Sequence, residues 1–163
     1  MSEIINKAKE FFNKRVIDCS SDPYKLLSHV PEVEKWARFL LKKHPEADEE
    51  VVLLGVWLHD IGHYPVSEID NAIKGEDSAR EFLIKNNYNN EKLKKAVHIV
   101  RSHRCRDVMP ETIEAKIVAF SDSASHMTDT MYLDMIRQGK LKKDVLGKIE
   151  RDFRDLSYFP EIK

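Results

Sequence analysis

The chain has 163 residues, the size of one domain built around one hydrophobic core. Hydrophobic residues make up 42% of it and charged residues 34%, which excludes an intrinsically disordered protein. The 27 basic side chains are balanced by 28 acidic ones, and a net charge of −1 argues against extended nucleic acid as the main partner.

Cysteine usage and the absence of targeting signals favour a cytoplasmic protein. Cys19 and Cys105 form neither a Cys-x-x-Cys pair nor a disulfide framework, as expected in a reducing compartment. The N-terminal segment lacks the apolar block and cleavage site of a signal peptide. The longest uncharged apolar run, 51–58, is much shorter than the roughly 18 to 20 residues that cross a bilayer, so no membrane partner is expected.

Apolar residues recur at helical spacing along most of the chain, and strand-like alternation of useful length does not occur, so we expect an all-α fold. The first predicted helix covers about 2–16. The sequence Ser21-Asp22-Pro23 is a helix-start signal and predicts a short helix that carries His29. A proline then opens a separate helix over about 31–43.

The next predicted helix covers about 48–61, with acidic residues at its start, an apolar middle and Gly62 as its stop. The stretch 63–75 is the least regular part of the chain and is a candidate active-site loop, although a purely structural loop fits its composition equally well. Four further helices are predicted at 76–85, 91–103, 110–127 and, after Gly139, 141–155. We expect one domain over 1–163, with a motif-bearing core at about 21–127 and a flanking helix at each end.

The pair His59-Asp60 stands at the end of the most apolar run in the chain. An imidazole and a carboxylate together suit a divalent cation such as Mn, Mg, Fe, Co, Ni or Zn, and burying either group without a partner is costly. His29 and Asp122 each lie in another predicted helix and supply two further candidate ligands. Each residue alone also fits a structural role, as a core histidine, a helix cap or a surface carboxylate, but the four together indicate a metal site.

The order of these residues resembles a known signature. His29, then His59-Asp60 within LLGVWLHDIG, then Asp122 is similar to the H…HD…D pattern of the HD-domain metal-dependent phosphohydrolase superfamily. Two further segments, KGEDSAREFL and PETIEAKIVAFSD, are also similar to small bacterial and archaeal members. The resemblance implies an all-helical fold in which the four residues hold a divalent ion, and an activity among nucleotide phosphatases or nucleoside triphosphate pyrophosphohydrolases.

Two imidazoles and two carboxylates would leave about two positions of an octahedral ion open, one for water and one for a phosphoryl oxygen. Such an ion makes the water a better nucleophile and offsets charge on the phosphate. We therefore expect hydrolysis of a phosphoester or phosphoanhydride in a small phosphorylated metabolite, most simply a nucleotide, with Asp60 counted among the catalytic residues.

A single ion per chain is expected. In some two-metal relatives a histidine that holds the second ion precedes a segment like Gly75-Glu76, and Lys74 stands in that place here. Because an ammonium has donors and no lone pair, Lys74 is assigned to phosphate binding. Glu76 or Asp77 either orients the attacking water as a general base or caps a helix.

The segment 98–106 concentrates histidines and arginines at a predicted helix end, where the helix dipole favours cations in any case. Its functional interpretation is a phosphate-binding edge, with His103 protonating the leaving group. His63 shares a helix face with His59 only if the helix continues past Gly62. The residues assigned to substrate binding are His63, Lys74, His98, Arg101 and Arg104.

Two other functions stay open from the sequence. One is a non-catalytic metal-binding or nucleotide-binding module, and the other is a di-iron oxygenase, which would need additional ligands. Hydrolysis of guanosine alarmones is disfavoured, because Ile61-Gly62-His63-Tyr64 follows the His-Asp pair where such enzymes often carry an acidic pair. The substrate, the metal and the oligomeric state are not specified by the sequence.

Overall fold

The computed structural model describes residues 2–162, and within this range the chain forms eight α-helices, one short 3-10 helix and no strand. The all-α prediction is confirmed. The helices are α1 (Glu3–Asp18), α2 (Leu26–Leu41), α3 (Glu49–Leu58), η1 (Ile61–His63), α4 (Asn71–Lys85), α5 (Asn90–Ser102), α6 (Ile113–Thr128), α7 (Met131–Arg137) and α8 (Lys142–Leu156).

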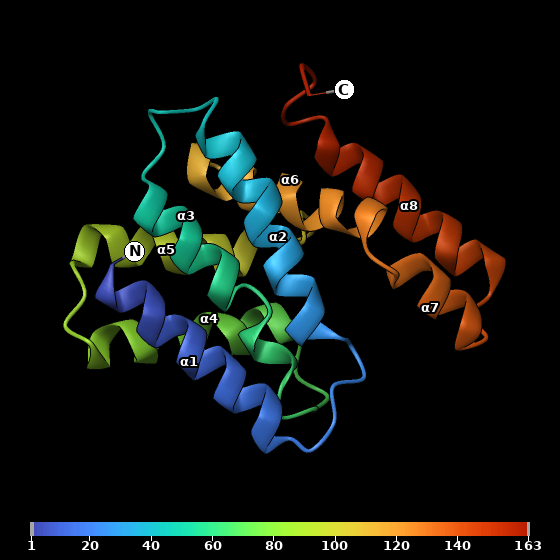
Figure 1. Cartoon of the computed structure of the whole chain (residues 1–163), viewed down its shortest axis with the longest axis horizontal. Coiled ribbons are helices and arrows are strands. Elements are labelled where there is room, and N and C mark those ends of the chain that lie inside the picture. The colour runs from blue at the N-terminus through green and yellow to red at the C-terminus, as the bar shows by residue number, and fades with distance from the viewer. Residues whose placement is uncertain (1, 163) are drawn as a thin grey trace.

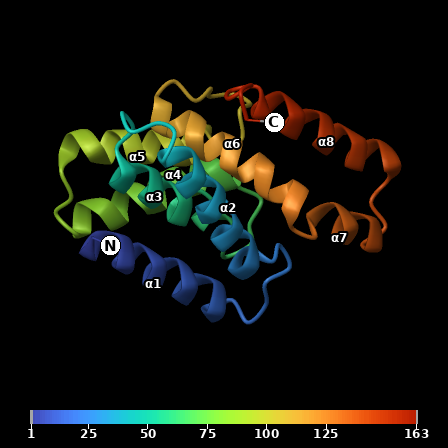
Figure 2. The same cartoon turned by 45° about the horizontal axis from the view of Figure 1, so that its top comes forward.

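Helices α2, α3, α5 and α6 pack against one another and form the centre of the molecule, while α1 covers α3. Helix α4 packs against α5, and the α7–α8 pair lies at the right-hand end of the molecule in both views (Figures 1 and 2). Within residues 2–162, no helix is both long and apolar enough to cross a membrane.

Helix α3 is the most deeply buried element and carries the chain to the His-Asp pair. Every residue from Val51 to Leu58 is buried. The Asp48 carboxylate caps the helix by accepting hydrogen bonds from the amides of Glu50 and Val51, at 3.1 and 3.3 Å. A helix that is apolar on all sides has to lie inside a core. The C-terminal end of α3 is therefore buried, and His59 and Asp60 follow it directly.

The cap of α3 leads to a stability prediction. The Asp48→Ala variant should lower the free energy of unfolding by about 1 kcal/mol, the usual loss for an N-cap, with a smaller contribution from the Lys92 ion pair. Urea unfolding followed by circular dichroism measures the change. Asp144→Ala, in the first turn of α8, is the control and should change stability by less than about 0.5 kcal/mol. Equal stability of the two variants would contradict the capping role.

Helix α2 runs without interruption through Pro31, so the predicted division into a short helix and a second helix at this proline is wrong. The Asp22 carboxylate accepts hydrogen bonds from the amides of Leu26 and Leu27, both at 2.9 Å, and this starts the helix early. Pro31 lies in the second turn and its missing amide removes one backbone hydrogen bond, which the buried face of the helix outweighs.

The predicted loop 63–75 is wrong in its second half, because α4 begins at Asn71 and not at Glu76. The Asp70 carboxylate caps this helix by accepting a 2.9 Å hydrogen bond from the Ala72 amide. Helix α7 was also not predicted. None of its residues is buried, so its sequence carries no clear apolar stripe.

The predicted helix 48–61 ends earlier, at Leu58, and the next turn is the 3-10 helix η1. Gly62 is not a left-handed helix cap, since it is absent from the positive-φ residues of the described chain. Instead, η1 packs directly on α4. A β-carbon at Gly62 would lie 1.9 Å from the carbonyl oxygen of Asn71 and 2.5 Å from the amide nitrogen of Gly75. Gly62 is therefore required for close backbone approach beside the His-Asp pair.

Candidate metal centre

The four predicted metal ligands lie together where α2, α3 and α6 meet. The Nε2 atom of His29 is 3.1 Å from Oδ1 of Asp122, and Nε2 of His59 is 3.4 Å from Oδ2 of Asp60. One ligand atom from each of His29, His59 and Asp122 can be chosen so that all three lie within 4.8 Å of one another. Side chains more than 90 residues apart in the sequence are thus arranged around one small volume.

The surroundings of His59 show that this volume fits a cation. Its Nδ1 donates a 2.8 Å hydrogen bond to the carbonyl oxygen of Val56, which leaves a lone pair on Nε2. The side chain is fully buried, and among residues 2–162 its Nε2 has no hydrogen-bond partner. A lone pair held 3.4 Å from a carboxylate oxygen needs a positive charge between the two atoms. A divalent ion of intermediate hardness meets that need, because imidazole and carboxylate both bind it.

The electrostatics of the cluster keep both carboxylates ionised. Burial raises the pKa of Asp122, but the neighbouring His126 and His29 hold it well below its usual range. Burial likewise opposes ionisation of Asp60, yet the charges of His59 and His63 and a hydrogen bond from His103 lower its pKa strongly. Ionised carboxylates are the form that binds metals.

The pKa of His29 is strongly raised by its neighbours. Burial lowers its pKa, but contacts with Asp122 and Asp129 outweigh burial and raise the pKa to about 10. The Oδ2 atom of Asp129 is 3.4 Å from Nδ1 of His29, opposite the face that meets Asp122. A carboxylate behind a metal-binding histidine orients the ring and increases its basicity.

Asp60 lies between two pairs of histidines. Its Oδ2 faces His29 and His59, at 3.8 and 3.4 Å, and its Oδ1 faces His63 and His103, both at 3.4 Å. The Nδ1 of His103 donates a 2.7 Å hydrogen bond to the carbonyl of the residue three positions earlier, as in His59. The sequence-predicted residues His63 and His103 are therefore part of the cluster.

Arg104 is anchored at the edge of this cluster. Its guanidinium donates to Oδ1 of Asn71 at 2.8 Å and to both oxygens of Asp70 at 2.7 and 2.8 Å. The amide of Asn71 in turn donates to Nε2 of His63 at 3.0 Å. This chain of bonds links the start of α4 to η1 and to the end of α5, so Arg104 and His63 are positioned together.

Besides Asp129, two further residues of the candidate site were not predicted from the sequence. His126 lies one turn after Asp122 on α6, with its Nε2 3.5 Å from Oδ1 of Asp122 and its ring stacked on His29 at 5.1 Å. Asp152 of α8 lies behind it, 3.3 Å from its Nδ1. The spacing of four between Asp122 and His126 in a predicted helix was a usable signal. No sequence pattern pointed to Asp152.

Five residues predicted to act in catalysis or substrate binding lie outside the cluster. The ammonium group of Lys74 is bonded to the carbonyl of Pro65 and the hydroxyl of Ser67. Glu76 pairs with Arg80 and Arg101, and Asp77 is exposed on α4. Arg101 also pairs with Asp107, and His98 accepts a hydrogen bond from the amide of Glu111. Except for the exposed Asp77, their charges and lone pairs are used in contacts within the scaffold.

Two cavities open onto the cluster. One, of about 240 Å³, lies beside Asp60 and Asp122 and extends to α8. The other, of about 570 Å³, extends from His29 and Asp60 toward α7. Both reach Asp60, His63 and His126, so the candidate metal centre lies where they meet. A substrate can therefore contact the cluster from two sides.

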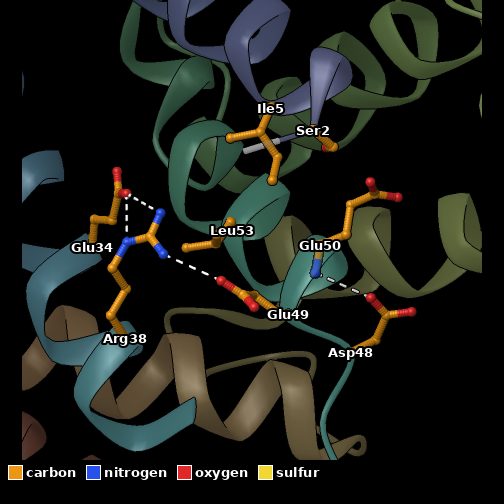
Figure 3. Close-up of a pocket in the computed structure, with 8 residues that line it drawn as sticks. All are labelled: Ser2, Ile5, Glu34, Arg38, Asp48, Glu49, Glu50 and Leu53. Atoms are coloured by element: carbon orange, nitrogen blue, oxygen red, sulfur yellow. Dashed lines mark hydrogen bonds and ion pairs between the residues drawn. The ribbon is translucent and has the colours of Figure 1, made fainter. Parts of the chain in front are cut away.

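A separate cavity of about 650 Å³ lies between α1, α2 and α3 and contains no histidine (Figure 3). Its carboxylates are already paired within the protein. Arg38 contacts both Glu34 and Glu49, and Lys92 lies 2.9 Å from Asp48. The hydroxyl of Tyr88 donates to Glu50 at 2.9 Å. This cavity is an ion-paired crevice, so the histidine-rich cluster is the better candidate for the functional site.

Two tRNA (cytidine(56)-2'-O)-methyltransferases are similar to the chain. The Picrophilus torridus protein is 30% identical over 150 residues, covering 81% of this chain and 41% of that protein. The Thermoplasma volcanium protein is 29% identical over 141 residues, covering 77% and 39%. The chain spans about two fifths of the length of these curated relatives.

The crystal structure of a predicted HD superfamily hydrolase from an uncultured Thermotogales bacterium has a similar fold. Its TM-score is 0.64 at 20% sequence identity, and the match covers 98% of this chain and 88% of that chain. The HD domain model matches residues 26–127, a range that contains His29, His59, Asp60 and Asp122. The chain therefore belongs to the HD domain family.

Proposed function

We propose that the protein is a metal-dependent phosphohydrolase that cleaves a small phosphorylated metabolite, most simply a nucleotide. The observation that carries this proposal is the buried cluster of two imidazoles and two ionised carboxylates, in which Nε2 of His59 has no hydrogen-bond partner among residues 2–162. Family membership and the fold of a hydrolase relative support it.

In this proposal His29, His59, Asp60 and Asp122 hold one divalent ion per chain. When bound there, the ion would lower the pKa of a water molecule and offset the negative charge that develops on a phosphoryl group. The carboxylates of Asp129, which is partly exposed, and Asp152, which is buried, stand behind His29 and His126 and orient the two rings.

The remaining residues of the cluster act on the substrate. Arg104, fixed by Asp70 and Asn71, presents its guanidinium to the smaller cavity, where it can hold phosphoryl oxygens. His103 lines the same cavity and is the proposed proton donor to the leaving group. Glu76 and Asp77 have no part in this mechanism, because the first is ion-paired away from the site and the second is exposed.

We do not propose for this chain the methyltransferase activity that the names of the two curated relatives state. Those proteins act on tRNA by name, and this chain spans about two fifths of their length. A cluster of buried imidazoles and carboxylates is suited to binding a cation, and its chemistry gives no support for methyl transfer. The balanced net charge of −1 also disfavours a large polyanionic partner.

A substrate panel tests the proposed activity. The protein, reconstituted separately with Mn, Mg, Fe, Co, Ni and Zn, is incubated with nucleoside mono-, di- and triphosphates and with simple phosphate esters. Phosphate or pyrophosphate should be released, and chelation should stop the release. Stoichiometric binding of metal and nucleotide without any product would instead support a non-catalytic binding module.

Metal content gives an independent prediction. Elemental analysis of the reconstituted protein should find about one divalent ion per chain. The ion binds only the folded state and therefore stabilises it. If the free ion is present at 100 times its dissociation constant, chelation should lower the free energy of unfolding by about 3 kcal/mol. For a chain of this size that corresponds to a fall of roughly 6 to 12 °C in the unfolding midpoint. Two ions per chain, with ligation by His63 and His103, would contradict the mononuclear site.

A further inference from the structure

The smaller of the two cavities at the cluster is lined by four carboxylates and four arginine or lysine side chains. It lies between the segment that follows α5 and helix α8, and Asp60 and Asp122 form its inner wall. The basic side chains that line it are Arg104, Arg106, Lys148 and Arg151. We call these four residues the cationic pocket.

Two of the four cations have no ion-pair partner among residues 2–162. Arg104 pairs with Asp70, and Lys148 pairs with Asp152. Arg106 and Arg151 have no carboxylate within ion-pair distance among residues 2–162. Asp155, a carboxylate that also lines the cavity, pairs with Arg154. Partial burial and the positive charges of Arg104 and Arg151 lower the pKa of Arg106. Like charges are held close together beside the metal centre, an arrangement that an anion would stabilise.

The backbone that presents these arginines is tied to α8. Cys105, between Arg104 and Arg106, is buried and has a φ of 48°, a left-handed conformation that is costly for a residue other than glycine. The guanidinium of Arg154 donates a 3.0 Å hydrogen bond to the carbonyl of Cys105 and holds this turn. Helix α8 lies beyond residues 26–127, so the pocket is completed by a part of the chain outside the matched family domain.

The larger cavity on the other side of the cluster combines apolar walls with three lysines, Lys25, Lys140 and Lys148, of which Lys148 lines both cavities. Leu26, Met131 and Met135 supply apolar walls, and Tyr24 adds an aromatic ring. The ammonium of Lys25 at its edge is neutralised by Asp134. Its volume of about 570 Å³ falls within the usual range of about 300 to 1,000 Å³ for small-molecule sites, whereas the cationic cavity of about 240 Å³ fits only a fragment.

From these two cavities we infer that the substrate contains a phosphoanhydride, with its organic part in the larger cavity and its outer phosphoryl groups on Arg106 and Arg151. This inference rests on the proposed phosphohydrolase function and specifies the class of substrate. The phosphoryl group attached to the organic part then lies at the metal centre, between the two cavities. A nucleoside di- or triphosphate has this layout, and a monophosphate leaves the cationic pocket empty.

The reaction follows from that placement. The oxygen of a water molecule attacks the phosphorus atom next to the organic part. The bond from this phosphorus to the bridging oxygen breaks, and its electron pair leaves with the orthophosphate or pyrophosphate held by the cationic pocket. The water gives up one proton to solvent or to a base in the site. The products are an organic monophosphate and either orthophosphate or pyrophosphate.

A double variant, Arg106→Gln with Arg151→Gln, tests the inference and keeps similar side-chain length. Its kcat/KM for nucleoside di- and triphosphates should fall by about 10- to 100-fold, because charge-assisted hydrogen bonds to the outer phosphates are lost. Hydrolysis of a monophosphate ester should change by less than about twofold. The matched control is Lys142→Gln with Lys143→Gln, which removes two exposed charges from α8 outside both cavities and should leave all rates unchanged.

Binding of imidodiphosphate, which has no cleavable anhydride bond, gives a readout independent of turnover. Calorimetry should show that the wild type and the lysine control bind it and that the arginine double variant binds it at least about 10-fold more weakly. Circular dichroism checks that the variants are folded. Equal affinity of all three proteins, or equal loss of mono- and diphosphate hydrolysis in the arginine variant, would overturn the inference. If binding depends on the two arginines but no substrate is turned over, the cationic pocket binds phosphate as inferred and the proposed phosphohydrolase function is refuted.

Discussion

The Asp60→Asn variant should lose its divalent ion and at least about a thousandfold in kcat/KM, equivalent to about 4 kcal/mol of transition-state stabilisation. Asp60 faces four histidines with its two oxygens, and one of these contacts is to the buried, unpartnered Nε2 of His59. Asparagine has nearly the same shape but no negative charge. The loss should therefore appear in metal content and in kcat, as measured by elemental analysis and steady-state kinetics.

The control for this substitution is Asp18→Asn, at the exposed end of α1. Among residues 2–162 this carboxylate pairs only with Lys14. The control variant should keep full metal content and wild-type kinetics. Far-ultraviolet circular dichroism of both variants establishes that the helices are intact. An Asp60→Asn protein that retains one ion and normal turnover would refute the assigned ligand set.

The Gly62→Ala variant should destabilise the protein by about 3 kcal/mol, the upper part of the usual range for overpacking. The added β-carbon would meet the carbonyl oxygen of Asn71 and the amide nitrogen of Gly75, at 1.9 and 2.5 Å. Both are backbone atoms, so η1 and α4 have to move apart. Since η1 follows Asp60 and includes His63, metal affinity should fall together with stability, and chemical unfolding and metal titration measure the two effects.

Gly147→Ala in α8 is the matched control for the glycine substitution. Its β-carbon would come no closer than 3.5 Å to any neighbour, the Nη1 atom of Arg151. Because alanine is the better helix former, this variant should be unchanged or up to about 1 kcal/mol more stable. If Gly62→Ala were as stable as Gly147→Ala, the close approach of η1 and α4 could not be what positions the site.

The fold could be predicted wherever one helix carries a clear apolar stripe and a strong end signal. Helix α5 and helix α8 match their predicted ranges to within one residue at each end. The errors came from local signals that tertiary packing overrides. Pro31 suggests a helix start, but the buried face of α2 continues through it. Helix α7 has no buried residue, and so the sequence contains no pattern that separates it from a loop.

The candidate site could be predicted in part, because the four proposed ligands follow a recognisable order along the chain. The structure brings these four together and adds His126 and Asp129, which lie close to Asp122 in sequence. Asp152, Lys148 and Arg151 come from α8, and only the packing of α8 against α6 shows that they reach the site. Conversely, Lys74 and Glu76 look like site residues in sequence, but their charges are used by neighbours in the scaffold.

The central claim is that one divalent ion, held by His29, His59, Asp60 and Asp122, is required for phosphate ester or anhydride hydrolysis. The most direct test is to remove metal from the purified protein, titrate Mn²⁺ back, and measure bound metal and product release in the same samples. Product release should be absent in the metal-free protein, rise in proportion to bound metal and reach its maximum at about one ion per chain. Equal turnover by the metal-free and metal-loaded proteins would contradict the claim.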